Sequence, residues 1–550
     1  MPSPSILDEL EKHISAAGAS ELLKVSLPRR PESHDVLVIP MKPSGQQGLI
    51  EEVRSAFTTH SSVADVRTDL DRQTLSISLH DTWVASIGGL LEQGCSPGLD
   101  TSDLAAGKRV VIDFCNPNAT KALHIGHLRN IAIGNALTGL AKACGAHTTT
   151  HSHVGDIGRS MGEAIAGCLL FGGRIGGHPV EVKSDHYVGQ CYAQYVLLLA
   201  NARYSDDPAL TREGTTGRSD LAEKVLRLVR GSDAVATDMW LKIRRLATDG
   251  HAQTLDRLGV AIDRTFYESD YAEAAVQFAD LLVKRRIVSD LRDGALVYHT
   301  GRQEYPRMIL RRADGVATQH LRFLSLWQAK SESLDGAVSL EVIGDEWAPL
   351  ARFGSEILRQ INENSERIHP SQFLTYGMVS LENGEVTSSD GGGLLADELL
   401  NRIAETQEIE ALVAQNSRFR LVDLTRIITL GWFLSRDMKK PMRLRPKAFT
   451  DIVYNPGWAI AEALVTAWDK EFDGNQEPPA RDPWYRFAVV HSQMHRRLAS
   501  HSLMHWDPVP LLKFHGHMAR WYLKAPRSAS LARCMRTVLS HGVATLGLSS

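Results

Sequence analysis

The chain has 550 residues, of which 43% are hydrophobic and 23% are charged, and its formal net charge at pH 7 is −3. This length predicts roughly three or four domains, and so small a charge indicates no particular class of partner. No apolar run reaches the roughly 18 residues that a membrane span needs, no signal peptide is visible, and the six cysteines form no Cys-x-x-Cys pair, so the sequence predicts a cytoplasmic protein with reduced thiols.

Residues 1–100 are predicted to form an α+β domain. Residues 6–14 have helical periodicity, and residues 74–79 alternate between polar and apolar side chains like a half-buried strand. Residues 83–91 are predicted to form a second helix, which is followed by a Ser-Pro-Gly linker at 96–98.

Residues 101–393 are predicted to form an α/β domain around a parallel sheet. The apolar run at 110–114 is typical of a strand that is buried on both faces. A helix is predicted over 128–143 and a second strand over 146–151, so this segment is expected to be a βαβ unit with a right-handed crossover.

A polar and helical stretch at about 180–265 is predicted to be an insertion between the two halves of the α/β domain. The sheet is expected to resume at residues 295–298 and again at 340–343. A Gly/Ser-rich segment at 387–393 is expected to close the domain.

Residues 394–550 are predicted to be helical throughout. Between residues 430 and 550 there are 17 Lys and Arg side chains against 9 Asp and Glu. Bound nucleic acid and a solvated protein surface both account for this local excess of positive charge. Candidate helices span 399–413, 418–434, 459–468, 485–498, 511–523 and 531–546.

The turn between the first strand and the first helix of the α/β domain carries the most distinctive residues, which are Lys121, His124, Gly126 and His127. Open α/β sheets bind ligands at the carboxyl ends of their strands. A helix start favours anions, and imidazoles there add donors that could face a phosphate. Two other interpretations remain open at this point: histidines that only cap and pack the helix, and a zinc site completed by a histidine of the next strand.

The residues around this turn resemble the signature of arginyl-tRNA synthetases. The run at 114–129, Phe-Cys-Asn-Pro-Asn-Ala-Thr-Lys-Ala-Leu-His-Ile-Gly-His-Leu-Arg, contains the HIGH tetrapeptide of class I synthetases, preceded by Pro-Asn and Lys. The next strand runs into His-Val-Gly-Asp-Ile-Gly at 153–158, which is also similar to that family. Weaker matches follow in the same order, so the resemblance covers nearly the whole chain.

The resemblance implies a Rossmann-type class I synthetase core at 101–393, with the α+β domain before it and an all-α bundle similar to an anticodon-binding domain at 394–550. It implies a monomeric ligase that uses ATP with Mg²⁺, activates arginine as an aminoacyl-adenylate and transfers it to tRNA, without a metal ion held by the protein itself. Two alternatives remain: a paralogue that adenylates another amino acid for a non-tRNA acceptor in specialised metabolism, and a non-catalytic pseudo-synthetase.

The resemblance also implies roles for individual residues. The groups that would act on the phosphates of ATP are His124, His127 and Lys121. The other ATP contacts would come from Gly126, Met378, Ser388 and Ser389. The amino-acid site would consist of Asp113, Cys115, Asn118, Gln319, Phe323 and Glu346.

Four parts of the sequence depart from the family pattern, among them the helix at 461–466 and the last residues, and the other two concern the active site. The second signature loop, KMSKS, keeps two serines but neither lysine, so Lys121 is expected to supply the charge that the loop lacks. In the family, a Tyr and an Asp bind the guanidinium group of the substrate arginine. Gln319 and Phe323 occupy those positions here. Glu346, or Asp345 beside it, is the expected replacement acceptor.

Overall fold

The computed structural model of the chain describes residues 5–17, 19–20, 23–28, 34–40, 47–69, 71–172, 182–203, 215–291, 293–334, 336–361, 372–382, 394–445, 448–469 and 479–549. The predicted Gly/Ser-rich segment at 387–393 lies outside these residues. Within them, no helix combines the length and the apolar character that crossing a membrane requires.

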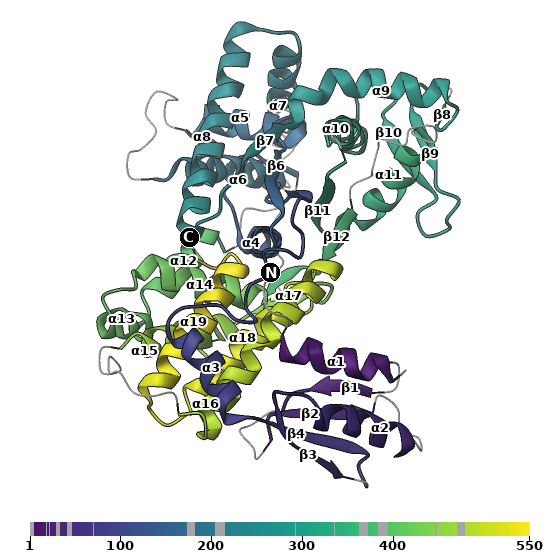
Figure 1. Ribbon diagram of the computed structural model, residues 1–550. Coiled ribbons are helices and arrows are strands. Elements are labelled where there is room, and N and C mark those ends of the chain that lie inside the picture. The colour runs from purple at the N-terminus through teal and green to yellow at the C-terminus, as the bar shows by residue number, and fades with distance from the viewer. Residues whose placement is uncertain are drawn as a thin grey trace.

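A five-stranded parallel sheet lies at the centre of the chain (Figure 1). Helix α4 (Ile125–Ala143) connects two neighbouring strands of it, as predicted for a βαβ unit. The strands are mostly buried, which explains their apolar sequences. The predicted α/β core with a parallel sheet is confirmed. The strand order is β12 (Gln372–Tyr376), β11 (Val338–Gly344), β5 (Arg109–Asp113), β6 (His147–Val154) and β7 (Arg264–Tyr267).

A second, antiparallel sheet lies beside the central one. It consists of β8 (Ser289–Asp290), β9 (Leu296–His299) and β10 (Arg307–Arg311). The prediction that the central sheet resumes at 295–298 is wrong, because β9 pairs in a hairpin with the next strand along the chain. The prediction for 340–343 is confirmed, since β11 pairs with β5. The helices that share an apolar cluster with this sheet are α9 (Ala272–Lys284), α10 (Gln319–Ser333) and α11 (Ala348–Ile361).

A helical crossover occupies the region predicted to be an insertion. Gly167 allows its first two helices to pack closely, because a Cβ there would lie 2.3 Å from the carbonyl oxygen of Cys191. The crossover connects β6 to its neighbour β7, so it adds helices without interrupting the sheet. Its helices are α5 (Arg159–Phe171), α6 (Ser184–Arg203), α7 (Thr215–Arg230) and α8 (Ala234–Leu258).

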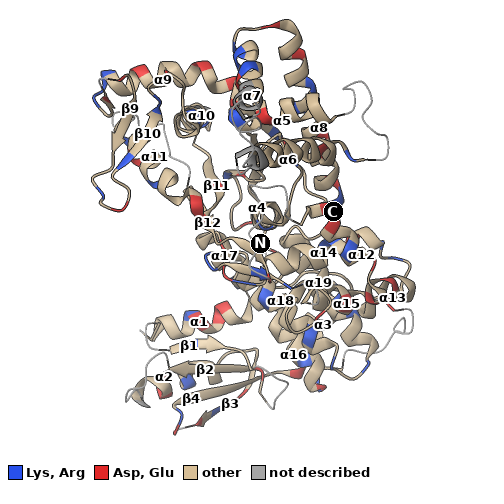
Figure 2. Cartoon of the chain, turned by 180° about the vertical axis from the view of Figure 1, so that it is seen from behind, with Lys and Arg blue, Asp and Glu red and all other residues tan. Residues whose placement is uncertain are grey.

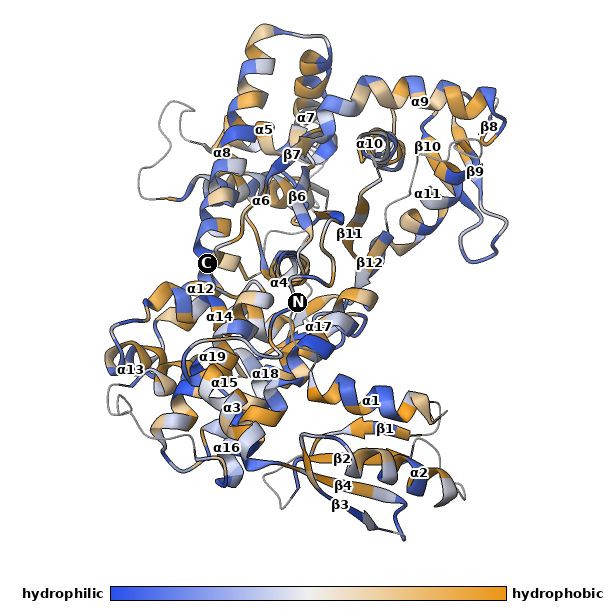
Figure 3. Cartoon of the chain, in the orientation of Figure 1, coloured by the Kyte–Doolittle hydropathy of each residue, from blue (hydrophilic) through white to orange (hydrophobic). Residues whose placement is uncertain are grey.

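The N-terminal region contains a four-stranded antiparallel sheet with the order β1-β2-β4-β3. Figure 3 shows hydrophobic residues along its strands, whose inward-facing side chains are buried. Helix α3 (Asp81–Glu92) follows this sheet and packs against the C-terminal helices α16 (Pro483–Ser492) and α19 (Ala529–Thr545). The other elements of the region are α1 (Ile6–Ala16), β1 (Leu23–Ser26), β2 (Val36–Pro40), α2 (Gln47–Thr58), β3 (Val63–Asp69) and β4 (Thr74–Leu79).

The C-terminal region is helical, as predicted. However, two of the predicted helices are each divided into two shorter helices in the structure. The predicted helix 399–413 is divided at Thr406, and the predicted helix 485–498 is divided at Gln493. A short strand, β14 (Met442–Leu444), also pairs in parallel with β13 (Val379–Leu381). The remaining helices are α12 (Ala396–Ala404), α13 (Gln407–Gln415), α14 (Leu421–Phe433), α15 (Pro456–Ala467), α17 (Met494–His505) and α18 (Val509–Tyr522).

The positive charges of this C-terminal region are distributed over several helices. Figure 2 shows Lys and Arg on α12, α14, α16 and α17 rather than on a single element. Some of them are used inside the protein, since Arg486 forms an ion pair of 2.6 Å with Asp35 of the N-terminal region. The local excess of basic residues is therefore partly structural.

Two buried histidines of this bundle should make the protein sensitive to acid. His495 Nδ1 and His515 Nε2 lie 2.9 Å apart, and burial lowers the pKa of His515 to about 3 and that of His495 well below its ordinary value. Because the unfolded chain then binds more protons, stability is complete above about pH 6.5 and falls toward pH 3, by about 1.4 kcal/mol per pH unit for each histidine.

The expected result is a urea midpoint that falls steeply between pH 6.5 and 4, and a shallower fall for His515→Gln. The matched control is His505→Gln, at an exposed position at the end of α17. Equal pH dependence in the wild type and both variants would contradict this origin of the acid sensitivity.

Candidate active site

A cavity of about 320 Å³ lies at the carboxyl ends of β5, β6 and β11. This is where open α/β sheets bind ligands, and the volume is in the range of small-molecule sites. Most of the residues predicted for the site line it: Asn118, Lys121, His124, Gly126, His127, Gln319, Phe323, Glu346 and Met378. Asp113 and Cys115 are not among the lining residues, and Ser388 and Ser389 lie outside the described residues.

His124 and His127 form the start of α4. His124 is the N-cap, and its Nδ1 accepts a hydrogen bond of 3.2 Å from the backbone N–H of Gly126. The backbone N–H of His124 donates to Nδ1 of His127, also at 3.2 Å. The ring centroids are 4.0 Å apart. The two histidines therefore do cap the helix, but both also line the cavity.

Both rings are neutral and present the same kind of donor. Burial lowers the pKa of His124 to about 4, helped by the nearby Lys121. Burial and the neighbouring His124 lower the pKa of His127 well below its ordinary value. A neutral imidazole that accepts at Nδ1 carries its proton on Nε2. Each ring therefore offers an Nε2–H donor, which suits the oxygens of a phosphate and does not change with pH near neutrality.

Gly126 has a local reason to be glycine. A Cβ at this position would lie 2.9 Å from Cε1 of His124, so a side chain would displace that ring. The glycine thus protects the geometry of the histidine pair as well as leaving room beside the backbone.

Lys121 supplies the positive charge of the cavity. Burial lowers the pKa of its ammonium. Nε2 of His251, a buried residue of α8, lies 2.9 Å from the carbonyl oxygen of Lys121. The helical crossover thus fixes the backbone of the turn, a contact between residues 130 positions apart that no local sequence pattern indicates.

Asparagines shape the side of the cavity formed by the turn. Asn118 forms a bridge with Gly155, where a Cβ would lie 2.3 Å from Asn118 Oδ1. Asn116 donates to Asp113 Oδ1 at 2.9 Å and accepts the backbone N–H of His153 at 2.9 Å. The bonds of Asn116 orient its amide group at the cavity wall, and the backbone bridge with Gly155 places Asn118 at the same wall. Amide groups there are suited to the amino and carboxylate groups of an amino acid.

Cys115 acts through its backbone. Its φ is +57°, and its N–H donates to Asn130 Oδ1 at 2.5 Å. Its thiol is buried, and burial raises the pKa of that thiol to about 12. The residue therefore holds the chain after β5 in its turn, while its side chain is buried and does not line the cavity.

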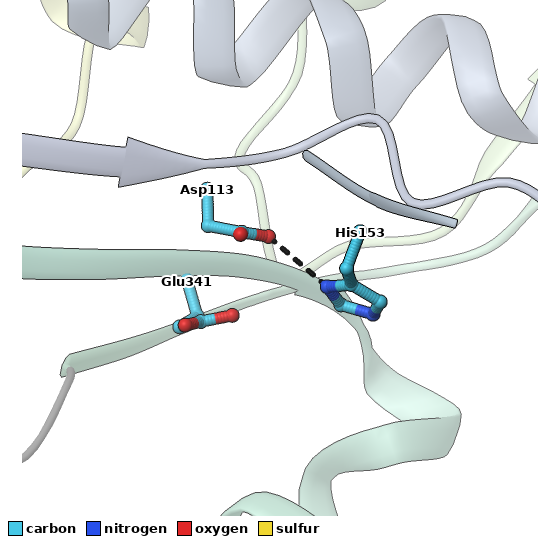
Figure 4. Close-up of side chains that lie close together, drawn as sticks. All are labelled: Asp113, His153 and Glu341. Carbon is cyan, nitrogen blue, oxygen red and sulfur yellow. Dashed lines mark ion pairs between the residues drawn. The ribbon is translucent and has the colours of Figure 1, made fainter. Parts of the chain in front are cut away.

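A buried charged network adjoins the cavity through His153, which also lines it. Figure 4 shows Asp113, His153 and Glu341 together, with Asp113 Oδ1 3.3 Å from His153 Nδ1. Lys330 of α10 contacts both carboxyl groups, at 2.5 Å from Asp113 Oδ2 and 3.4 Å from Glu341 Oε1. Sequence reasoning identified Asp113 but not Lys330 or Glu341.

The three residues in Figure 4 have the donor types and proximity of a metal site. They do not fit a metal ion in this arrangement, because the Lys330 ammonium contacts both carboxyl groups and would repel a second cation there. Among the described residues that line the cavity itself, Glu346 is the one carboxylate. Mg²⁺ brought by ATP would thus be held mainly by phosphate oxygens and water.

Aromatic rings form the wall opposite the turn. Phe323 and Trp327 lie on α10, and Trp347 follows β11. The ring centroids of Phe323 and Trp347 are 5.3 Å apart, and those of Phe323 and Trp327 are 6.2 Å apart. Gln319 and Glu346 provide polar groups beside these rings. Glu346 lies over the backbone of Gly344, and partial burial raises the pKa of its carboxyl group.

Arg129 links helix α4 by hydrogen bonds to the segment after β12 and to the loop before β14. Its guanidinium donates to the carbonyl oxygens of Gly377 at 2.5 Å, Lys440 at 2.7 Å, Asp437 at 2.9 Å and Met438 at 3.1 Å. The side chain is completely buried. Met378, predicted to contact ATP, lies next to one of these carbonyls and lines the cavity.

A parallel α/β core with a cavity at the carboxyl ends of its strands, and with a histidine pair at the start of α4 lining that cavity, has the arrangement of a nucleotide-binding domain. The chain belongs to the family of class I tRNA synthetases (R), whose catalytic-domain model matches residues 98–427.

Curated relatives and solved structures agree with this family. The chain is 25% identical to an arginine--tRNA ligase of Borrelia duttonii over 338 residues (59% of this chain, 54% of the relative). It is 25% identical to one of Treponema denticola over 370 residues (65% of this chain, 59% of the relative). The chain thus aligns with little more than half the length of these curated relatives.

Two solved structures share the fold over almost the whole chain. The arginyl-tRNA synthetase of Thermus thermophilus has a TM-score of 0.68 at 18% identity, with 98% of each chain covered. That of Plasmodium falciparum has a TM-score of 0.69 at 12% identity, with 100% of this chain and 99% of the other covered. At these identities the likeness is one of fold.

Proposed function

We propose that the chain activates an amino acid with ATP and transfers it to the 3′ end of a tRNA. The observation that carries this proposal is the neutral histidine pair at the start of α4, with two Nε2–H donors beside a cavity of suitable size. Arginine is the amino acid in the names of the relatives and is therefore the reference substrate.

In the first step, a carboxylate oxygen of the amino acid attacks the α-phosphorus of ATP. The new P–O bond forms as the bond to the bridging oxygen of the β-phosphate breaks, and pyrophosphate leaves with that electron pair. No proton transfer from the protein is required, so the residues act by positioning and by stabilising charge. His124, His127 and Lys121 are the groups available for the phosphates.

In the second step, a ribose hydroxyl of the tRNA attacks the activated carbonyl and AMP leaves. The C-terminal helices supply the basic side chains for a polyanion, with Arg and Lys spread over several helices (Figure 2). We place this reaction in the cytoplasm, in a monomer that uses ATP with Mg²⁺.

ATP–pyrophosphate exchange, measured with each of the twenty amino acids with and without total tRNA, tests the proposal. Exchange that depends on an amino acid is expected, followed by charging of tRNA in a direct acylation assay. No exchange with any amino acid, by protein that is folded and binds ATP, would contradict the proposal. Exchange without any charging of tRNA would restrict it to the first step.

A further inference from the structure

Helix α8 contacts the histidine turn, residues 121–127, through one buried side chain. His251 is 4% exposed, and its Nε2 lies 2.9 Å from the carbonyl oxygen of Lys121. Burial lowers the pKa of His251, so the ring is neutral. Because a carbonyl oxygen can only accept, Nε2 carries the proton. Among the residues that the structure describes, Nδ1 of this ring has no hydrogen-bond partner, so the side chain is directed at the turn alone.

The same face of α8 holds a second segment. Thr254, three residues after His251, donates from Oγ1 to Asp397 Oδ2 at 2.9 Å. Arg257, three residues further on, donates from Nη1 to Asp397 Oδ1 at 2.7 Å. Residues three apart are neighbours on a helix surface. One side of α8 therefore contacts both the histidine turn and the start of α12.

Asp397 is a buried and charged acceptor. It is 5% exposed, and burial alone would raise its pKa, but His186 and Lys183 hold that pKa well below its usual range. Asp397 lies close to His186 and Asp185 as in a metal site. However, the Lys183 ammonium already lies 3.1 Å from Asp185 and 2.7 Å from Asp397. The cluster therefore anchors a segment of backbone and is not suited to a metal ion.

The anchored segment pairs directly with the histidine turn. His124 and Leu395 form an antiparallel bridge, and the backbone hydrogen bonds on either side of it are 2.9 and 3.2 Å long. Asp397 follows this bridge by two residues. Helix α8 thus supports both sides of the bridge, one at the carbonyl oxygen of Lys121 and the other at the carboxylate of Asp397.

We propose that His251 and Asp397 are positioning residues for amino-acid activation, which fix Lys121 and His124 relative to each other by holding the histidine turn and its bridged segment against α8. Neither residue lines the cavity, so both act through the groups that do. A displacement of about 1 Å in such groups can cost about 10² in rate. The inference rests on the proposed activation and concerns only how the groups for ATP are held in place.

The first test compares His251→Leu with His251→Gln in pyrophosphate exchange. Leucine fills the site without a donor, whereas glutamine keeps an N–H that can reach the same carbonyl oxygen. In His251→Leu, kcat is expected to fall about 10- to 100-fold, with KM for the amino acid within about twofold of the wild type. His251→Gln should recover kcat to within about threefold. Gln253→Ala, at an exposed position of α8, is the matched control.

The second test asks whether the two contacts act as one support. Asp397→Asn should lower kcat about tenfold, and its combination with His251→Leu should lower kcat by less than the product of the two single losses, because both release the same turn. Thr254→Val removes one donor to Asp397 without leaving a charge unpaired. It takes the place of Asp397→Asn in this comparison if a thermal melt shows that variant to be unfolded.

The outcomes separate this inference from the proposed function. Wild-type kcat in folded His251→Leu, or equal losses in both His251 variants, would overturn the role of the hydrogen bond. Losses that multiply fully in the double variant would overturn the shared support. In each of these cases the wild type still exchanges pyrophosphate, so the proposed activation stands. Absence of exchange in the wild type would overturn the proposed function, and the inference with it.

Discussion

Replacing His124 and His127 together by alanine is expected to abolish pyrophosphate exchange. Both rings line the cavity and offer Nε2–H donors, and removing one donor at a site of developing charge typically costs about 10²–10³ in kcat. Loss of both should lower the rate by about 10⁴ or more, which is below detection in an exchange assay. Full activity of the double variant would contradict the assignment of the phosphate site.

His124 is also the N-cap of α4, so the loss of a phosphate donor must be distinguished from the loss of the cap. Loss of an N-cap costs only about 1 kcal/mol, so the double variant should remain folded in a thermal melt. His124→Asn keeps a residue type that caps helices well but removes the imidazole, and its rate should fall as far as that of His124→Ala. His147→Ala, at an exposed position at the start of β6, is the control and should be as active as the wild type.

These histidines also predict a flat pH profile. Since the pKa of His124 is lowered to about 4 by burial, the ring stays neutral from pH 9 down to about pH 5. The exchange rate of the wild type should therefore not titrate near pH 6.5. The His124→Asn variant should have a pH profile of the same shape there, although its rate is lower. A His-dependent titration near pH 6.5 would mean that the ring is charged in the working enzyme.

Replacing Lys330 by methionine is expected to destabilise the protein by about 3–5 kcal/mol, the usual cost of removing one partner of a buried ion pair. Burial alone would raise the pKa of Asp113, but Lys330 and His153 hold it well below its usual range. Without the ammonium, that carboxylate remains buried and without its cation. The measurement is the free energy of unfolding in urea at pH 7.

Glu341→Gln is the matched variant and is expected to change stability much less. Burial, with the charge of Asp113, raises the pKa of Glu341 to about 8, so the side chain is mostly protonated at pH 7 and resembles an amide. Because the folded state binds this proton more tightly, the contribution to stability is complete below about pH 4.5 and is lost as the pH rises to 8. Glu341→Gln should remove that loss. Equal destabilisation by both variants would contradict the assigned charges.

The sequence was sufficient to predict those parts of the molecule whose structure is determined by residues close together in the chain. The β5–α4–β6 unit follows from one apolar run, one turn and one periodic segment, and the turn itself identified Lys121, His124 and His127. Two helix boundaries were missed for different reasons. Thr406 is a residue type that often begins helices, so a signal was present there, whereas Gln493 interrupts a continuous helical pattern without glycine or proline.

The parts that could not be predicted are those that tertiary packing brings together. Lys330 meets Asp113 across 217 positions, and Arg129 reaches carbonyl oxygens 248 to 311 positions away. No local sequence pattern indicates either contact. A lysine on an apolar helix, or an arginine after the histidine turn, could equally well be exposed to solvent. The pairing of Arg322 with Glu268 belongs to the same group, at a separation of 54 positions.

Helix α4 begins at the histidine pair and meets the last described residues of the chain near its other end. Asn135 Nδ2 donates to the carbonyl oxygen of Gly547 at 2.5 Å, a contact that spans 412 positions. A Cβ on Gly139 would lie 2.4 Å from the backbone nitrogen of Gly547, so the two segments are in close contact. During synthesis on the ribosome, Asn135 therefore emerges 412 residues before Gly547, so this part of the packing of α4 can form only after the helices between them have been made.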